Sequence, residues 1–122
     1  MKLVIVESPY AGDVERNVQY ARSAMLDCLI RGEAPLASHL LYTQVLDDAA
    51  PESRRMGIEA GLAWGWHAHA TVVYTDLGVT PGMQQGVERA NQQGRMVVTR
   101  SIAAWAGGVD PGWTFPSGRG GA

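Results

Sequence analysis

Two polar segments of the chain follow apolar runs and carry side chains suited to holding a small ligand. The first, residues 4–17, reads VIVESPYAGDVERN. It combines groups for hydrogen bonds, an aromatic ring that can stack on a base or orient a carboxylate, and a glycine that lets a ligand approach the backbone. It also leads into a helix, whose first free N–H groups favour a phosphate or carboxylate. The residues expected to contact such a ligand are Ser8, Pro9, Tyr10, Gly12 and Asn17. An ordinary strand-to-helix turn is the alternative, because the segment is neither a Walker loop nor a Rossmann glycine fingerprint.

The second segment, residues 76–83, reads DLGVTPGM and follows the apolar run ATVVYT. Asp76 comes at the end of that run. A carboxylate there can accept hydrogen bonds from a sugar hydroxyl, or act as an acid or base if its pKa is raised. Capping of the loop is the alternative role for Asp76. Gly82 and Met83 open the following helix and are expected to contact the same ligand.

The histidines divide into one candidate ligand contact and one poor metal motif. His39 follows the second predicted strand and is expected at the same edge of the sheet, with a purely structural role as the alternative. His67 and His69 form the motif HAH, but two histidines without a third ligand make a poor zinc site, and we expect no metal. Arg54 and Arg55 open a helix, where solvated side chains are expected, although a cation there could reach a phosphate.

The elements that must position these residues alternate between strands and helices. The continuous apolar run at residues 3–6 is typical of a strand buried on both faces of a parallel sheet. The alternation predicts an α/β domain with a doubly wound parallel sheet of about four or five strands. Ligands bind beyond the carboxyl ends of the strands in such folds, so the two polar segments should face one crevice. The predicted strands are residues 3–6, 35–38, 70–75 and 95–99, and the predicted helices are residues 13–30, 51–66 and 82–93.

Two helices show a pattern of small or apolar residues. In the first, Asp13 is a candidate N-cap and Gly32 a candidate stop, and the predicted apolar stripe is Val14, Val18, Ala21, Met25 and Leu29. In the second, Gly57, Gly61 and Gly65 recur every fourth residue and would let another backbone approach closely. Packing within the chain and contact between subunits are both compatible with this stripe. Trp64 and Trp66 are expected to pack rather than to contact a ligand.

The composition fits one packed domain and excludes several classes of partner. The chain has 122 residues, of which 46% are hydrophobic and 18% charged, and its formal net charge is −2. A nucleic acid polymer or a membrane surface needs a basic field, so neither is an expected partner.

The single cysteine, Cys28, forms no disulfide within the chain and is expected to be buried. The apolar run at the N-terminus is too short for a signal peptide or a membrane span, which predicts a cytoplasmic location. Residues 1–106 are the predicted domain and residues 107–122 a Gly/Pro-rich irregular tail.

Three stretches resemble a known superfamily. They read SPYAGDVERNVQYAR, PLASHLLYTQVLDDAAPESRRMGIEAG and VVYTDLGVTPGMQQGVERANQQGRMVV. Together they are similar to nucleoside 2-deoxyribosyltransferase-like proteins, in particular to a branch of small phage and bacterial proteins, over residues 2–100. If the chain is encoded by a phage, the expected location is the cytoplasm of the host cell.

The resemblance implies a flavodoxin-like fold, a nucleoside or nucleotide ligand, no cofactor, and action on the N-glycosidic bond. It also implies a homo-oligomer, since neighbouring chains commonly complete the sites in this superfamily. In those proteins a helix glutamate attacks the anomeric carbon, a first-loop tyrosine orients it, and an aspartate binds the sugar or handles protons. Tyr10 matches the tyrosine and Asp76 the aspartate.

The chain departs from the superfamily at the glutamate. Ala90 and Gly94 match the family's Ala and Gly at the helix end, and counting back from them puts Gly86 at the nucleophile's position. A glycine cannot form a glycosyl-enzyme intermediate. Glu88 lies two residues further on, on the other side of an ideal helix.

Two hypotheses follow from this departure. The chain is either an enzyme that cleaves or transfers at the N-glycosidic bond of a (deoxy)nucleotide, using another carboxylate, or a nucleotide-binding protein without that chemistry. A phage protein that sequesters a signalling nucleotide is an example of the second. In both cases Gly86 enlarges the pocket and is expected to line the ligand site. A third possibility is a scaffold or interaction domain that has lost ligand binding, with the stripe of Gly57, Gly61 and Gly65 as its main feature.

Overall fold

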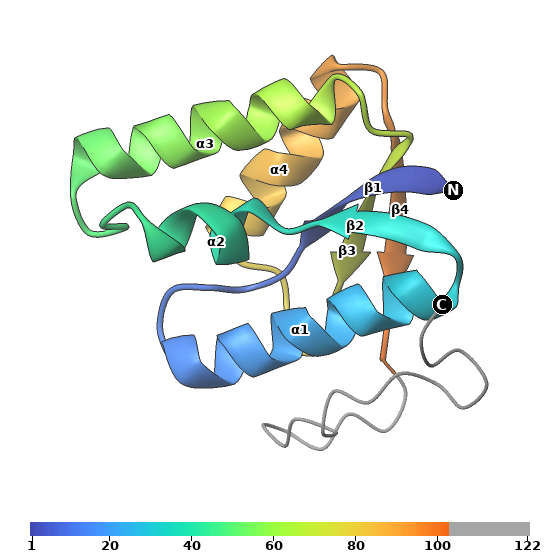
Figure 1. Cartoon of the computed structure of the whole chain (residues 1–122), viewed down its shortest axis with the longest axis horizontal. Coiled ribbons are helices and arrows are strands. Elements are labelled where there is room, and N and C mark those ends of the chain that lie inside the picture. The colour runs from blue at the N-terminus through green and yellow to red at the C-terminus, as the bar shows by residue number, and fades with distance from the viewer. Residues whose placement is uncertain (103–122) are drawn as a thin grey trace.

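The computed structural model describes residues 1–102, in which four strands alternate with helices (Figure 1). The predicted tail, residues 107–122, and the domain end at residue 106 lie outside the described residues. The strands are β1 (Lys2–Glu7), β2 (Glu33–Leu36), β3 (Ala70–Tyr74) and β4 (Met96–Arg100). The helices are α1 (Val14–Ile30), α2 (Ser38–Leu41), α3 (Pro51–Gly65) and α4 (Pro81–Gln92), with a 3₁₀ turn η1 (Tyr42–Gln44) after α2.

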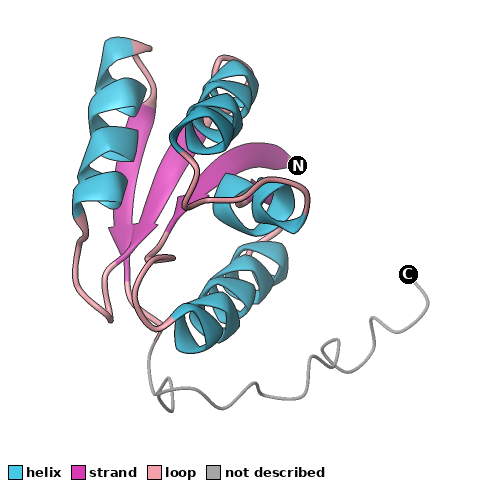
Figure 2. Ribbon diagram, turned by 90° about the vertical axis from the view of Figure 1, so that its left-hand side faces the viewer, coloured by secondary structure: helices cyan, strands magenta, loops and turns pink. Residues whose placement is uncertain are grey.

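The four strands form one parallel sheet in the order β2-β1-β3-β4, which confirms the predicted doubly wound α/β fold. The chain moves outward from β1 to β2, then crosses back over β1 to β3 and β4. Right-handed crossovers therefore put α1 on one face of the sheet and α3 and α4 on the other (Figures 1 and 2). The change of direction between β1 and β3 is the topological switch point, where ligands bind in this class of fold.

Side chains of β1 alternate between the two faces of the sheet. Val4 and Val6 belong to the buried cluster that packs against α1. Ile5 and Glu7 point to the opposite face, because successive side chains in a strand alternate. The carboxyl group that ends β1 is therefore directed toward the layer that contains α4.

The predicted apolar stripe of α1 forms only a small part of the buried face of the helix, although Met25 packs against the core. Asp13 caps the helix as predicted, since its carboxylate accepts a hydrogen bond from the backbone N–H of Arg16 at 3.2 Å. The buried residues of α1, however, are Asn17, Tyr20, Ala21, Ser23, Ala24 and Cys28. Only Ala21 belongs to both sets, and Val14 is 40% exposed. Hydrogen bonds explain part of the difference, because the polar tips of Asn17 and Tyr20 find partners inside the fold. Cys28 is fully buried, as predicted.

The glycine stripe of α3 packs against the chain itself. A Cβ at Gly61 would lie 3.0 Å from Ser38 Oγ, and one at Gly65 would lie 2.9 Å from Gln93 Oε1. Gly57 faces Tyr42 and Leu46. The structure thus favours packing within the chain over a subunit contact for this stripe. It also places His39 in α2, where a loop was predicted.

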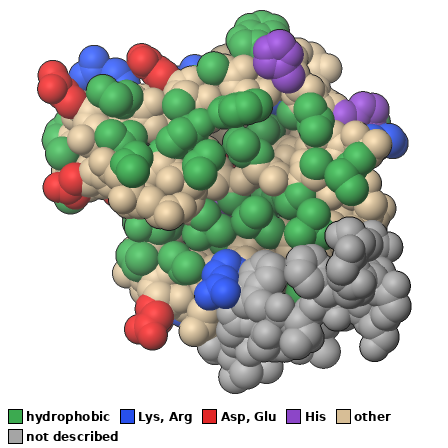
Figure 3. All heavy atoms as spheres, viewed as in Figure 1, with side chains coloured by type: hydrophobic (Ala, Val, Ile, Leu, Met, Phe, Trp, Pro, Cys, Tyr) green, Lys and Arg blue, Asp and Glu red, His purple; other side chains and the backbone are tan. Residues whose placement is uncertain are grey.

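Large apolar side chains remain exposed around α2 and α3. Trp64 and Trp66 are 52% and 68% exposed, so the prediction that both are packed is wrong. Trp64 donates a hydrogen bond from its indole N–H to the Tyr42 hydroxyl at 2.7 Å. Figure 3 shows apolar side chains gathered over this part of the surface. The other large apolar residues exposed here are Leu41, Val45, Met56 and Ile58.

The predicted homo-oligomer stays a prediction. No helix of residues 1–102 has the length and apolar character needed to cross a membrane.

Candidate functional site

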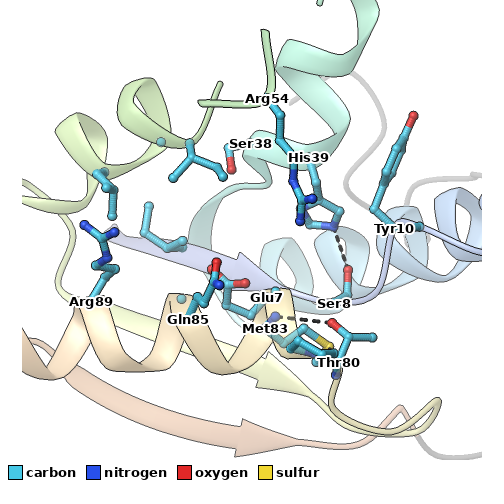
Figure 4. Close-up of a pocket in the computed structure, with 18 of the residues that line it drawn as sticks. Glu7, Ser8, Tyr10, Ser38, His39, Arg54, Thr80, Met83, Gln85 and Arg89 are labelled. Carbon is cyan, nitrogen blue, oxygen red and sulfur yellow. Dashed lines mark hydrogen bonds between the residues drawn. The ribbon is translucent and has the colours of Figure 1, made fainter. Parts of the chain in front are cut away.

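A cavity of about 360 Å³ opens at the carboxyl end of β1, between β1, α3 and α4 (Figure 4). Its position is the one expected for a ligand in a doubly wound sheet. Of the ten residues predicted to act on or contact a ligand, six line it: Ser8, Tyr10, His39, Gly82, Met83 and Gly86. Other residues that line it and carry polar side chains are Glu7, Ser38, Asp48, Arg54, Thr80, Gln85, Arg89 and Arg95.

Ser8 and His39 form a polar pair on one wall. Ser8 Oγ lies 2.8 Å from His39 Nε2 in a hydrogen bond. Burial lowers the pKa of His39 from 6.5 to about 4, so the imidazole is neutral at physiological pH. A neutral imidazole with such a low pKa is a weak base. The pair is therefore suited to fixing the shape of the wall and to forming hydrogen bonds, rather than to carrying charge.

Tyr10 continues this wall as an aromatic surface. Its ring meets the His39 ring edge to face, with centroids 6.5 Å apart and an angle of 78° between the planes. Figure 4 shows the Tyr10 hydroxyl directed away from Glu7. This geometry suits contact with an apolar or aromatic part of a ligand. The role implied by the resemblance, orienting a nucleophile, stays a prediction.

The carboxyl group of Glu7 lies against Gly86 on the floor of the cavity. A Cβ atom built on Gly86 would lie 2.3 Å from both Cδ and Oε2 of Glu7. No residue larger than glycine fits at position 86 while Glu7 keeps this position. The space beside the helix, which a glutamate at position 86 would use, is therefore occupied by a carboxyl group from β1.

Burial controls the charge of Glu7. It raises the pKa of Glu7 from 4.5 to about 8, and the positive charge of Arg95 opposes this rise only in part. The hydrogen bonds of Arg95 run to Thr71 Oγ1 at 2.9 Å and to the Gly65 carbonyl at 2.5 Å. Because this cation is engaged elsewhere, Glu7 is largely protonated at neutral pH. The cavity floor thus holds a carboxylic acid able to donate a proton.

Two exposed arginines stand at the rim of the cavity. Arg54 comes from α3 and Arg89 from α4, and both line the cavity from opposite sides (Figure 4). Guanidinium groups bind phosphate and carboxylate with paired hydrogen bonds. The rim can therefore receive an anion while the floor stays uncharged.

Asp76 lies outside the cavity lining, and its oxygens are already engaged. Tyr20 donates a hydrogen bond to Asp76 Oδ2 at 2.6 Å, the backbone N–H of Ile102 donates to the same oxygen at 2.8 Å, and the Ser101 hydroxyl donates to Oδ1. Partial burial would raise the pKa of Asp76, but these hydrogen bonds outweigh it and hold the pKa below its usual value. These hydrogen bonds are those of a loop cap, the alternative role from sequence, and the predicted role of Asp76 at a ligand stays a prediction.

Three predicted contacts in the first loop also lie outside the lining, namely Pro9, Gly12 and Asn17. The Asn17 amide donates hydrogen bonds to the carbonyls of Tyr10 and Ala11, at 2.9 and 3.0 Å, and so shapes the loop. Gly12 has a φ of +98°, which explains the glycine by backbone conformation. The anion expected at the start of α1 is replaced by the chain's own Asp13 carboxylate.

Sequence reasoning missed Glu7, Arg89 and Arg95. A signal for Glu7 existed, because strand alternation puts it on the same face as Ile5. Nothing local in the sequence showed that this face meets Gly86.

Among residues 1–102, no group of three or more His, Cys, Asp or Glu side chains is placed to hold a metal ion.

Residues 2–100 match the model of the protein family described as "Domain of unknown function (DUF7768)". The chain belongs to this family. A comparison with curated proteins found no match.

The DUF7768 domain is similar in structure to a 2-deoxyribosyltransferase from the psychrotolerant bacterium Bacillus psychrosaccharolyticus. The TM-score is 0.66 and the sequence identity 14%, and the match covers 81% of this chain and 72% of the other. At this identity the likeness establishes a shared fold. It agrees with the α/β fold that the resemblance implied.

Proposed function

We propose that this chain binds a nucleoside or nucleotide in the cavity and cleaves or transfers at its N-glycosidic bond. The observation that carries the proposal is the Glu7 carboxyl group, which takes the place beside α4 that Gly86 leaves free. The missing glutamate of the helix is thus offset by a carboxyl group from β1, at the same cavity. The similar fold of a 2-deoxyribosyltransferase supports the choice of ligand.

The rest of the cavity fits the parts of a nucleotide. Tyr10 and His39 offer an aromatic wall for the base, and hydroxyl groups such as Ser8 offer hydrogen bonds to a sugar. Arg54 and Arg89 at the rim offer cations for a phosphate. A volume of about 360 Å³ lies within the usual range for small-molecule sites.

A second candidate function is nucleotide binding without chemistry, and the observation that favours it is Gly86 itself. A glycine removes the residue that would form the covalent intermediate. Binding survives such a loss in many enzymes, because the nucleophile adds more to the rate than to affinity.

One experiment separates the two functions. Purified protein is mixed with each common nucleoside and nucleoside monophosphate, in the ribose and deoxyribose series. Thermal unfolding reports binding, and chromatography of the same samples reports released base. Stabilisation with released base supports the enzyme. Stabilisation with every ligand intact supports the binding protein, and absence of stabilisation across the panel contradicts both.

The rim arginines make a sharper prediction. If Arg54 binds a phosphate, nucleoside monophosphates should stabilise the protein more than the corresponding nucleosides do. Arg54→Ala should then weaken monophosphate binding by about tenfold, as expected for loss of a charge-assisted hydrogen bond, and leave nucleoside binding unchanged. Titration calorimetry measures both affinities.

Arg55→Ala is the matched control, because Arg55 is also exposed on α3 but does not line the cavity. Equal losses in the two variants would indicate a general charge effect. That result would contradict a phosphate contact at Arg54.

A further inference from the structure

We infer that Glu7 is the general acid of this site: its carboxyl group donates a proton to the nucleobase as the N-glycosidic bond breaks. The inference rests on the proposed function and specifies the role of one residue in it. Glutamates that act on this bond from the start of a helix do so as nucleophiles. The geometry of Glu7 points to a different role.

The first argument is the position of the carboxyl group at the cavity. It lies between the end of β1 and the backbone of α4, where a Cβ at Gly86 would approach its atoms to 2.3 Å. Glu7 is the last residue of a central strand, and its backbone is paired with Val73 of β3. A proton donor needs a defined position relative to the leaving group, and this arrangement supplies one.

The second argument is the lack of partners that would stabilise the charged form. Within residues 1–102, no hydrogen bond or ion pair to the Glu7 carboxyl group is formed, whereas Asp76 accepts three hydrogen bonds from other residues. The charged and titratable groups that face the cavity around Glu7 are Tyr10, His39, Asp48, Arg54, Arg89 and Arg95. His39 is neutral, and Arg95 directs its hydrogen bonds to Thr71, Gly65 and Gln93.

The raised pKa agrees with these two observations. A group with a pKa of about 8 holds its proton at pH 7 and gives it up readily when a base nitrogen becomes more basic. A nucleophile needs the ionised form instead, which is the minor form of Glu7 at that pH.

The step balances with water as the second reactant. The Glu7 proton moves to a ring nitrogen of the base, and the electron pair of the bond between C1′ and the base leaves with the base. A water oxygen then forms a bond to C1′ and gives one proton to the Glu7 carboxylate, which restores the acid. The products are the free base and the sugar or sugar phosphate.

The test compares leaving groups that do and do not need a proton. The natural substrates are the nucleosides and monophosphates from which the wild-type protein releases base. The probe is the 7-methylguanine nucleoside or monophosphate, in the ribose and deoxyribose series, whose base leaves as a neutral molecule without protonation. Glu7→Gln should lower base release from the natural substrate by about 100-fold or more. The same variant should lower release of 7-methylguanine by less than about tenfold.

Two further measurements keep the test independent of folding. Glu88→Gln is the matched control, because Glu88 is an exposed residue of α4 that does not line the cavity, and it should leave both rates unchanged. Thermal shift with the same ligands should show that Glu7→Gln still binds them. In the wild-type protein, base release from the natural substrate should fall above about pH 8, and the Glu7→Gln variant should not show this fall.

Each other result overturns part of the proposal. Equal losses on both leaving groups in Glu7→Gln would overturn the role of acid, and so would an unchanged rate on the natural substrate. Nucleotide binding by the wild-type protein without release of any base would overturn the role of acid and leave the binding function intact. No binding by the wild-type protein would overturn the proposed function itself.

Discussion

The buried carboxyl group of Glu7 makes the stability of the fold depend on pH. In the unfolded chain this group loses its proton near pH 4.5, and in the folded chain near pH 8. Between these values the folded state binds more protons than the unfolded state. The contribution of Glu7 to the free energy of unfolding therefore falls as the pH rises from about 4.5 to about 8, and this contribution is constant outside that range.

Glu7→Gln should remove this dependence, because a neutral amide has no proton to lose. We expect the variant to match the wild-type protein within about 1 kcal/mol at pH 4.5 and to be more stable by about 2–3 kcal/mol at pH 8. Urea unfolding at both pH values measures the difference. His39 also titrates in the acidic range, but it is present in both proteins and cancels in the comparison. A difference that stays constant with pH would contradict a protonated Glu7.

The sequence predicted the residues on the Ser8 wall of the cavity but not the acid on its floor. Ser8, Tyr10 and His39 follow the ends of strands, so the fold alone places them near the switch point. Glu7 looked like the boundary where an apolar run stops. Its chemistry depends on the absence of a side chain at Gly86, and residues so far apart in sequence meet only in three dimensions.

Helix α4 is shaped by its contact with Glu7, and Gly86→Ala tests this coupling. Alanine in place of glycine in a helix interior is favourable by about 1 kcal/mol. Here the added Cβ would lie 2.3 Å from the Glu7 carboxyl group, which must then move. We expect Gly86→Ala to stabilise the Glu7→Ala variant more than it stabilises the wild-type protein. The difference between the two effects on the free energy of unfolding should be about 1 kcal/mol or more. Chemical denaturation of the four proteins in this double-mutant cycle measures the coupling.

Base release provides the second readout of the same cycle. Gly86→Ala displaces the carboxyl group without removing it, so it should lower the rate while it leaves Glu7 in place. Additive stabilities together with an unchanged rate would show that Glu7 adapts at no cost, and would contradict a fixed acid.

The four strands and the three long helices were predicted within one or two residues, because their ends carry strong local signals, whereas the short helix α2 was missed. Asp13 begins α1, Pro51 begins α3, and Gly94, with a φ of +68°, lies just beyond the end of α4. Most of the buried face of α1 was not predicted, because the stripe was chosen by hydrophobicity alone. Buried residues with polar atoms, such as Tyr20 and Asn17, are invisible to that criterion when their partners are distant in sequence.

Across the molecule, the order of the strands explains which predicted sites come together. The carboxyl ends of β1 and β3 lie side by side, so the loops after both strands reach the switch point. The start of α4 turns toward the cavity, whereas Asp76 turns toward α1 and the end of β4. A prediction made from strand ends alone cannot separate these two directions.

Asp76 therefore serves as a link between three elements, and Asp76→Asn tests this role. Its carboxylate joins the end of β3 to Tyr20 of α1 and to Ser101 and Ile102 beyond β4. The lowered pKa means that the charged form stabilises the fold above the ordinary value of 3.8, and that this stability is lost as the pH falls through the lower folded value. Since Asp76 is exposed, we expect a loss of only about 1–2 kcal/mol at pH 7. Urea unfolding at pH 7 and at pH 3 should show the difference shrinking at the lower pH.

The same variant separates a structural link from a catalytic carboxylate. If Asp76 acts through the fold, Asp76→Asn at a temperature where it stays folded should bind nucleotides and release base at wild-type rates, within about twofold. Tyr20→Phe, which removes one hydrogen-bond donor to the same carboxylate, should also be less stable than the wild-type protein at pH 7. If instead Asp76→Asn keeps its stability and loses base release, the carboxylate contacts substrate. The cavity would then have to extend past Thr80 to reach it.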